Sequence, residues 1–185
     1  MKTFTRVEPT DVVVVGDKFK RDVVVKRFGT EDGLMHEFTT FFSEGSAATA
    51  VLAVTEDGDV VATHQFRAGP EEWLWQLPGG GIEQGEDSEQ AARRELREET
   101  GYEAGTMEYL GACHDDAYLN VKQHVFYATG CRKLREQRPD KTEAEQGMEV
   151  GLMTMNELLE KASTGKTCDN GALLMGYLRH VKEGK

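Results

Sequence analysis

Cysteine, proline and long apolar runs are all scarce in this chain of 185 residues, which has three cysteines and four prolines. The cysteines lack the paired spacing of a zinc site, so they are expected to be reduced thiols in a cytoplasmic protein. No stretch is long and apolar enough to span a bilayer, and the polar start MKTFTRVEPT is unlike a signal peptide. No membrane association is therefore expected. The length predicts one domain, or one with a small appendage.

Basic residues are also few, because 22 Lys and Arg stand against 33 Asp and Glu, for a formal net charge of −11. A chain this acidic repels a nucleic-acid backbone, so no nucleic-acid partner is expected. A phosphorylated small molecule would need local positive charge from a metal ion or an arginine.

What the sequence does contain is an unusual segment from Gly79 to Gly105, GGGIEQGEDSEQAARRELREETGYEAG. Asp87 or Ser88 can cap a helix, and good helix formers follow. Gly101 supplies a C-terminal stop. The segment therefore predicts a helix from about Ser88 to Thr100.

One face of this predicted helix carries Glu95, Glu98 and Glu99, given about 100° of rotation per residue. Like charges at these spacings cost about 0.2–0.5 kcal/mol per pair, and carboxylates near a C-terminus oppose the helix dipole. Arg94 offsets part of this cost because Glu98 is its i+4 neighbour. A solvated charged face is the ordinary interpretation of such a cluster. The alternative is a bound cation that removes the repulsion.

The stretch before the helix favours the cation. Pro78 ends a strand-like run, and Gly79, Gly80, Gly81 and Gly85 follow it. Glycines let a backbone come close to an ion, and a loop carbonyl can join carboxylate oxygens around it. Mg²⁺ prefers oxygen ligands of this kind.

The spacing from Gly80 to Tyr102 resembles the Nudix box, G-x5-E-x7-R-E-U-x-E-E-x-G-U, in which U is a bulky apolar residue, and every constrained position is filled. The family hydrolyses nucleoside diphosphates linked to another moiety, using Mg²⁺ or Mn²⁺. The resemblance implies metal binding by carboxylates and a loop carbonyl, an outer or occasional ligand at Glu86, and a salt-bridging role for Arg94. The implied metal ligands are Glu95, Glu98 and Glu99, with the backbone carbonyl of Gly79 or Gly80.

Strand-like runs dominate the first half of the chain. They are expected at Asp11–Gly16, Lys20–Gly29, Leu34–Phe42, Ala47–Thr55, Asp59–Arg67 and Trp73–Leu77, with later strands in TMEYLGACH, KQHVFYATGC and QGMEVGLMT. Two final helices are expected at about Met155–Ser163 and about Asp169–Val181, with Asn156 and Asp169 as possible caps. The resemblance covers about Ala47 to Lys185 and implies an α/β fold, the Nudix α/β/α sandwich with a mixed sheet. Residues 1–45 are expected to form an N-terminal antiparallel β extension, and residues 46–185 the Nudix hydrolase domain.

Three features resemble the ADP-ribose pyrophosphatase branch of the family: the N-terminal strands, QFR before LWQLPGG, and the STGKTCDNGALL helix. In that branch the N-terminal strands help to form a homodimer and part of the nucleoside pocket. The resemblance places Arg67 on phosphate or ribose; an exposed strand-end charge is its alternative role. Trp73 or Trp75 can border the base pocket while the other faces the core. Tyr118 can stack on a base or simply pack.

Two departures from that branch leave the substrate open. The stretch CHDDAYLNVKQH lacks the usual proline, and the usual LPAG is LPGG here. The first hypothesis is an enzyme that cleaves ADP-ribose to AMP and ribose 5-phosphate. Dinucleoside polyphosphates, GDP-sugars and modified nucleotides are alternative substrates, and a nucleotide-sugar sensor that does not cleave is a different class. In the ADP-ribose branch a glutamate on a late loop serves as the base, and the matching candidates are Glu143 and Glu145.

Overall fold

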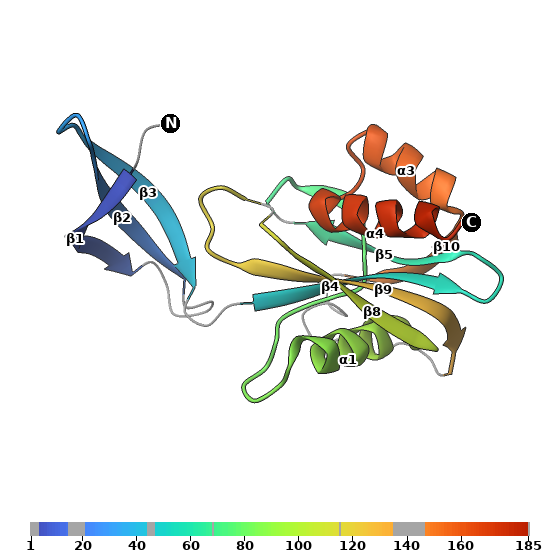
Figure 1. Cartoon of the computed structure of the whole chain (residues 1–185). Helices are drawn as coiled ribbons and strands as arrows, with labels where there is room; N and C mark the ends of the chain where they lie inside the picture. The colour runs from blue at the N-terminus through green and yellow to red at the C-terminus, as the bar shows by residue number, and fades with distance from the viewer. Residues whose placement is uncertain are drawn as a thin grey trace. The chain divides into compact units, whose positions relative to one another are not determined.

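The computed structural model describes residues 4–14, 21–43, 47–67, 69–114, 116–134 and 147–184 (Figure 1). The chain divides into two compact units. The N-terminal sheet unit comprises residues 1–46 and 116–121, and the sandwich unit comprises residues 47–115 and 122–185. No helix in the described ranges combines the length and apolar character that a membrane crossing requires.

The N-terminal sheet unit is a three-stranded antiparallel sheet in the order β1-β2-β3. Its strands are β1 (Phe4–Val14), β2 (Arg21–Thr30) and β3 (Met35–Ser43). The segment 116–121 joins this unit along β3, where the Phe41 N–H donates to the carbonyl of Tyr118 at 2.7 Å and Phe41 forms a parallel bridge with Leu119. The prediction of N-terminal antiparallel strands is confirmed.

The sandwich unit has a seven-stranded sheet in the order β10-β5-β4-β9-β7, with β6 paired to β5 and β8 paired to β9. Its elements are β4 (Ala47–Thr55), β5 (Val60–Arg67), β6 (Glu72–Gln76), α1 (Ser88–Thr100), β7 (Tyr102–Glu103), β8 (Thr106–Cys113), β9 (Lys122–Lys133), β10 (Glu149–Met153), α3 (Met155–Ser163) and α4 (Asn170–Lys182). The sheet is mixed because β4 and β9 run parallel while the other pairs are antiparallel. Figure 1 shows α1 on one face and α3 and α4 on the other, so the predicted α/β/α sandwich is confirmed.

The core forms on both faces of the central strand β4, which reads as a nearly continuous apolar run. Val51 and Ala53 pack under α1 with Leu96, whereas Leu52 and Val54 pack toward α3 and α4. This alternation follows from the two-residue period of a strand. It ties the helix that carries the glutamates to the most buried strand of the sheet.

Local capping fixes the ends of α1. Asp87 is the N-cap: its side chain accepts a hydrogen bond from the Gln90 N–H, and the Gln90 side chain accepts one from the Asp87 N–H. This reciprocal pair is a capping box. At the other end Gly101 has φ 76°, and its N–H donates to the Arg97 carbonyl at 3.0 Å. The helix boundaries and the glycine stop predicted from sequence are confirmed.

The predicted cap of α3 at Asn156 is wrong. Thr154 caps this helix instead, because its hydroxyl accepts from the Glu157 N–H while the Glu157 carboxylate accepts from the Thr154 N–H. Asp169 is the residue before α4, as expected, but it has φ 61° and its side chain makes no capping hydrogen bond. Its carboxylate instead accepts from the Gln123 side-chain amide at 3.4 Å.

Asp87→Ala is expected to lower the free energy of unfolding by about 1 kcal/mol, because it removes the N-cap acceptor of α1. Ser88→Ala, one residue later, removes no capping contact and is the matched control. Urea titration of both variants measures the difference. Equal stability of the two variants would show that the capping box contributes nothing.

Candidate active site

The glycine loop is fixed to β4 by backbone hydrogen bonds. The Thr49 N–H donates to the carbonyl of Gly80 at 2.8 Å, and the Val51 N–H donates to that of Pro78 at 2.9 Å. Gly79 lies between these bonds, so close to β4 that a Cβ there would be 2.0 Å from the Thr49 carbonyl oxygen. Only glycine fits at this position without moving backbone.

Arg94 is the centre of a charged network over the loop. Its Nε and Nη2 donate to the two carboxylate oxygens of Glu86, each at 3.0 Å, and its Nη1 donates to Glu95 at 2.8 Å and Glu98 at 3.2 Å. Its Nη2 also donates to the Gly81 carbonyl at 2.9 Å. One guanidinium therefore holds three carboxylates and the loop together, in the bidentate geometry that suits arginine.

The charges in this network stabilise one another. The hydrogen bond from Arg94 holds the pKa of Glu86 below its usual range. The pKa of Arg94 is raised above its ordinary value, chiefly by its hydrogen bond to Glu86 and then by those to Glu95 and Glu98. The lowered pKa of Glu86 and the raised pKa of Arg94 both favour the ion pair between these two residues. The salt-bridging role predicted for Arg94 has a geometric basis in these contacts.

Glu99 connects the helix to the loop from beneath. It is 1% exposed, and its Oε2 accepts a hydrogen bond from the Gly79 N–H at 2.9 Å. The remaining side of α1 packs on the sheet through Ala92 and Leu96. The buried apolar strip therefore sets the rotation of the helix and turns its acidic face toward the loop.

A cavity of about 340 Å³ opens at this junction. Its walls come from the glycine loop and the acidic face of α1, through Gly80, Gly81, Ile82, Glu83, Arg94, Glu95 and Glu98. A Cβ on Gly80 would lie 2.5 Å from the Glu95 carboxylate, so the absence of a side chain there keeps the cavity open.

The donor set of this site fits a hard divalent cation, because it offers several carboxylates beside a backbone loop. Within the described ranges, however, no group of three or more His, Cys, Asp or Glu side chains is gathered closely enough to hold an ion. The reason is visible in the contacts: Arg94 binds Glu86, Glu95 and Glu98, while Glu99 accepts from the loop. The carboxylate and carbonyl oxygens are therefore of the type that a divalent cation prefers. In this structure, hydrogen bonds to the Arg94 guanidinium determine how the carboxylates of Glu86, Glu95 and Glu98 are arranged.

Arg67 lies at the end of β5, and its Nη2 donates to the Gln76 side-chain carbonyl. Cys168, in the loop before α4, donates from Sγ to the same Gln76 oxygen at 3.4 Å. Sequence reasoning missed Gln76 and Cys168. Strand pairing could have indicated Gln76, because the two-residue period places it on the same face of the β5–β6 pair as Arg67.

The other predicted site residues lie elsewhere. Trp73 faces away from Gln76, on the side of β6 that carries Trp75, where it packs near His64. Tyr118 belongs to the N-terminal sheet unit and is 56% exposed. Glu143 and Glu145 fall outside the described residues, and so does the loop that contains them.

The sandwich, the glycine loop and the acidic helix define a Nudix module, and the NUDIX domain family matches residues 45–168. The chain therefore belongs to the Nudix family.

Among individual relatives, the chain is 38% identical to the ADP-ribose pyrophosphatase of Bacillus subtilis (strain 168) over 115 residues, which are 61% of this chain and 62% of that protein. The match thus spans less than two thirds of that relative's length. It is 28% identical to the methanol dehydrogenase activator of Bacillus methanolicus over 137 residues, 74% of this chain and 73% of that protein. The crystal structure of an ADP compounds hydrolase has a TM-score of 0.78 and 19% identity, covering 98% of this chain and 95% of that one. This last likeness shows the fold.

Proposed function

We propose that the protein is a cytoplasmic hydrolase that cleaves the phosphoric anhydride of a nucleoside diphosphate linked to a sugar. ADP-ribose is the proposed substrate, with AMP and ribose 5-phosphate as products. The observation that carries the proposal is the carboxylate network of Arg94 beside the glycine loop. The similarity to the Bacillus subtilis ADP-ribose pyrophosphatase supports the choice of substrate.

Nudix hydrolases generally use divalent metals, and Mg²⁺ or Mn²⁺ is the proposed cofactor. The proposed ligands are Glu95, Glu98 and Glu99 with the carbonyl of Gly79 or Gly80, and Glu86 is the outer or occasional ligand. When bound, such an ion polarises phosphoryl oxygens, activates water and offsets the charge of the leaving phosphate.

The chain's own residues are proposed to prepare this site. Arg94 holds the carboxylates of Glu86, Glu95 and Glu98 together by hydrogen bonds, and Glu99 holds the loop through the Gly79 N–H. Arg67 is proposed to bind a phosphate or ribose oxygen, and Gln76 limits the orientation of its guanidinium. Tyr118 remains a candidate for stacking on the base. In a chain of net charge −11, these arginines supply the local positive charge that an anionic substrate needs.

The test is a hydrolysis screen over ADP-ribose, a GDP-sugar, a dinucleoside polyphosphate and a modified nucleotide, each with Mg²⁺, with Mn²⁺ and with EDTA. Release of AMP and ribose 5-phosphate from ADP-ribose only with metal is the expected result. If another compound is cleaved faster than ADP-ribose, that compound is the substrate and the ADP-ribose assignment is wrong. Saturable ADP-ribose binding without cleavage of any compound would favour the sensor class.

A separate prediction concerns the general base. The box glutamates are assigned to the metal, so Glu143 or Glu145 is proposed to deprotonate or orient the attacking water, which needs only a modest base when its pKa is lowered. Glu143 is the preferred candidate. Glu143→Gln or Glu145→Gln is expected to reduce kcat with little change in metal affinity, as measured by kinetics at several Mg²⁺ concentrations. Full kcat in the double variant would rule out both residues.

A further prediction concerns assembly. Within the N-terminal sheet unit, β3 and the turn before it carry large apolar side chains that are 40–55% exposed, namely Leu34, Met35, Phe38 and Phe41. Exposed apolar surface and open strand edges favour association. A two-fold homodimer that uses these strands, residues 1–45, is therefore expected. Light scattering at micromolar protein concentration measures the oligomeric state. A monomer at that concentration would count against the predicted homodimer.

A further inference from the structure

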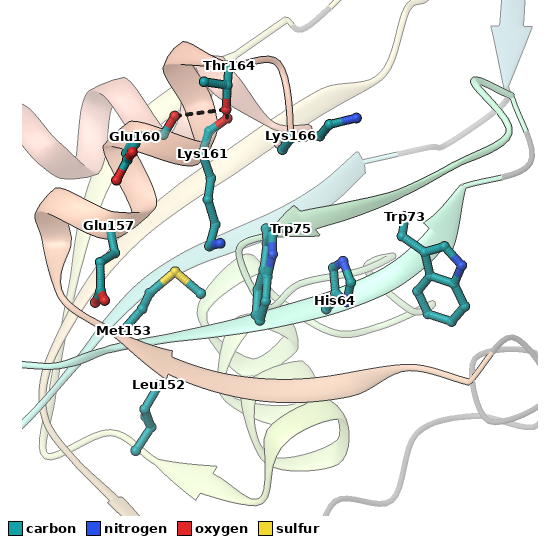
Figure 2. A pocket seen from close by; sticks show the side chains of 10 residues that line it. All are labelled: His64, Trp73, Trp75, Leu152, Met153, Glu157, Glu160, Lys161, Thr164 and Lys166. Atoms are coloured by element: carbon teal, nitrogen blue, oxygen red, sulfur yellow. Dashed lines mark hydrogen bonds between the residues drawn. The ribbon is translucent and has the colours of Figure 1, made fainter.

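A second and larger cavity, of about 610 Å³, lies between α3 and the β5–β6–β10 part of the sheet (Figure 2). Its lining is His64, Trp73, Trp75, Leu152, Met153, Glu157, Glu160, Lys161, Thr164 and Lys166. Ala62, two residues before His64 on β5, packs with the core under α3 and α4, whereas Val61 packs under α1. By strand alternation the cavity is on the α3 side of the sheet, and Arg67 points to the α1 side. We call this space the tryptophan cavity.

Three rings form one wall of the tryptophan cavity. His64 stacks on Trp75 with ring centroids 4.5 Å apart and an interplanar angle of 20°, and Trp73 is 5.4 Å from His64 on the other side. Figure 2 shows the three rings in a row along the paired strands. Trp73 is 46% exposed, so this end of the row presents aromatic surface to a ligand.

Glycines in β10 and just before it lie against these rings. A Cβ on Gly151 would be 2.6 Å from the Trp75 ring, and a Cβ on Gly147 would be 3.4 Å from the Trp73 ring. The Trp75 ring therefore lies where a side chain at position 151 would otherwise stand, whereas a Cβ at position 147 would only contact the Trp73 ring. The position of Trp75 in the cavity wall thus depends on Gly151.

The charge that faces the rings is Lys161. Its Nζ lies 5.2 Å from the Trp75 ring centroid, in the geometry of a cation–π contact, and Figure 2 shows the side chain reaching from α3 toward that ring. The wall also carries Lys166, which pairs with Glu72 at 2.6 Å, and the carboxylates of Glu157 and Glu160. Glu157 accepts the Thr154 N–H, and this bond and, less strongly, the charge of Lys161 lower its pKa. In the described part of the chain, no carboxylate lies within ion-pair distance of Lys161.

We propose that the tryptophan cavity is a second ligand site, for a flat heteroaromatic ring that carries an anionic group and has the size of a nucleoside monophosphate. The ring stacks at the Trp73–His64 end, and the anion pairs with Lys161. A cationic ligand is disfavoured because Lys161 already occupies the face of Trp75. The cavity volume is in the range of small-molecule sites, and stacking on aromatic side chains accepts any base. This site goes beyond the proposed hydrolysis, which takes place on the other side of the sheet.

The test uses the chain's own optical reporter, because its two tryptophans both line this cavity. AMP is titrated into the full chain in EDTA, with excitation at wavelengths where adenine does not absorb. Saturable quenching of the tryptophan emission is expected. Adenosine is expected to bind more weakly than AMP, and inorganic phosphate alone is expected to leave the emission unchanged.

Lys161→Met keeps the unbranched apolar part of the side chain but removes the ammonium group, and it is expected to raise the Kd for AMP about tenfold, with no effect on adenosine. Lys182→Met, on the exposed end of α4, is the matched control. Trp73→Phe retains Trp75 as reporter and is expected to weaken AMP and adenosine alike. Glu98→Gln is expected to keep the wild-type Kd, since it lies on the other side of the sheet.

Three results would overturn the site: quenching that does not saturate, an unchanged Kd in Lys161→Met, or a changed Kd in Glu98→Gln. The last would locate the nucleotide at α1. Because the titration is done without metal and follows binding alone, its outcome is independent of whether the protein hydrolyses ADP-ribose.

Discussion

Glu98→Gln is expected to lower turnover of ADP-ribose by at least about 100-fold, since even the outer partners of metal ligands contribute 10–100-fold. The substitution removes one negative charge from the proposed metal site. Its structural cost is small, because the Glu98 side chain is 44% exposed and accepts a 3.2 Å hydrogen bond from Arg94. Kinetics with Mg²⁺ and thermal melting in EDTA measure the two effects separately.

Glu89→Gln is the matched control on the same helix. Glu89 is exposed and pairs with Arg93 at 2.9 Å, away from the glycine loop, so its loss is expected to leave turnover unchanged. Melting in EDTA should be equal or higher for Glu98→Gln, because one repulsion on the acidic face is gone. Wild-type turnover in Glu98→Gln would refute its assignment as a metal ligand.

Gly79→Ala is expected to lower the free energy of unfolding by about 2–3 kcal/mol, the upper part of the range for overpacking. The added Cβ would lie 2.0 Å from the Thr49 carbonyl oxygen and 2.9 Å from the Ala50 Cα. These are backbone atoms of the buried strand β4, so they cannot move as a flexible side chain does. The same shift would break the hydrogen bond from the Gly79 N–H to Glu99.

The neighbouring glycines give a graded comparison. A Cβ on Gly81 meets nothing within 4 Å, so Gly81→Ala is expected to melt as the wild type does. A Cβ on Gly80 meets the movable end of Glu95, so Gly80→Ala is expected to reduce activity more than stability. Urea titration and turnover of all three variants test this order. A Gly79→Ala protein as stable as Gly81→Ala would mean that the loop moves freely.

The elements that sequence predicted best are those whose signals are local. The helix from Ser88 to Thr100 follows from a cap, a run of helix formers and Gly101, and the structure has these boundaries. The rotation of about 100° per residue in a helix places Glu95, Glu98 and Glu99 on one face. The i+4 contact between Arg94 and Glu98 was also readable, whereas the contact with Glu86 depends on the path of the loop, which no periodicity describes.

Thr154 was missed as the cap of α3 because Asn has the higher intrinsic N-cap preference, although the local T-x-x-E spacing from Thr154 to Glu157 indicates a capping box. Features that depend on distant segments were not predictable. The tryptophan cavity brings Lys161 of α3 to Trp75 of β6, two elements that are far apart in sequence. The expectation that one tryptophan faces the core while the other borders the base pocket was wrong, because residues two apart on a strand share a face, and Trp73 and Trp75 both line this cavity.

The parallel pairing of β4 with β9 has a consequence for how the protein folds during synthesis. β4 ends at Thr55, and β9, its parallel partner, begins at Lys122. The central pair of the sheet therefore forms only after the long segment between them has been synthesised. Non-local pairing of this kind slows folding, and unpaired edges are exposed in the meantime. The α1 helix emerges from the ribosome within that interval, yet its apolar side packs on Phe126 and Ala128 of β9. Val51 and Ala53 of β4 are made earlier and also pack under α1, but the buried surface that fixes the helix is complete only after β9 has been synthesised.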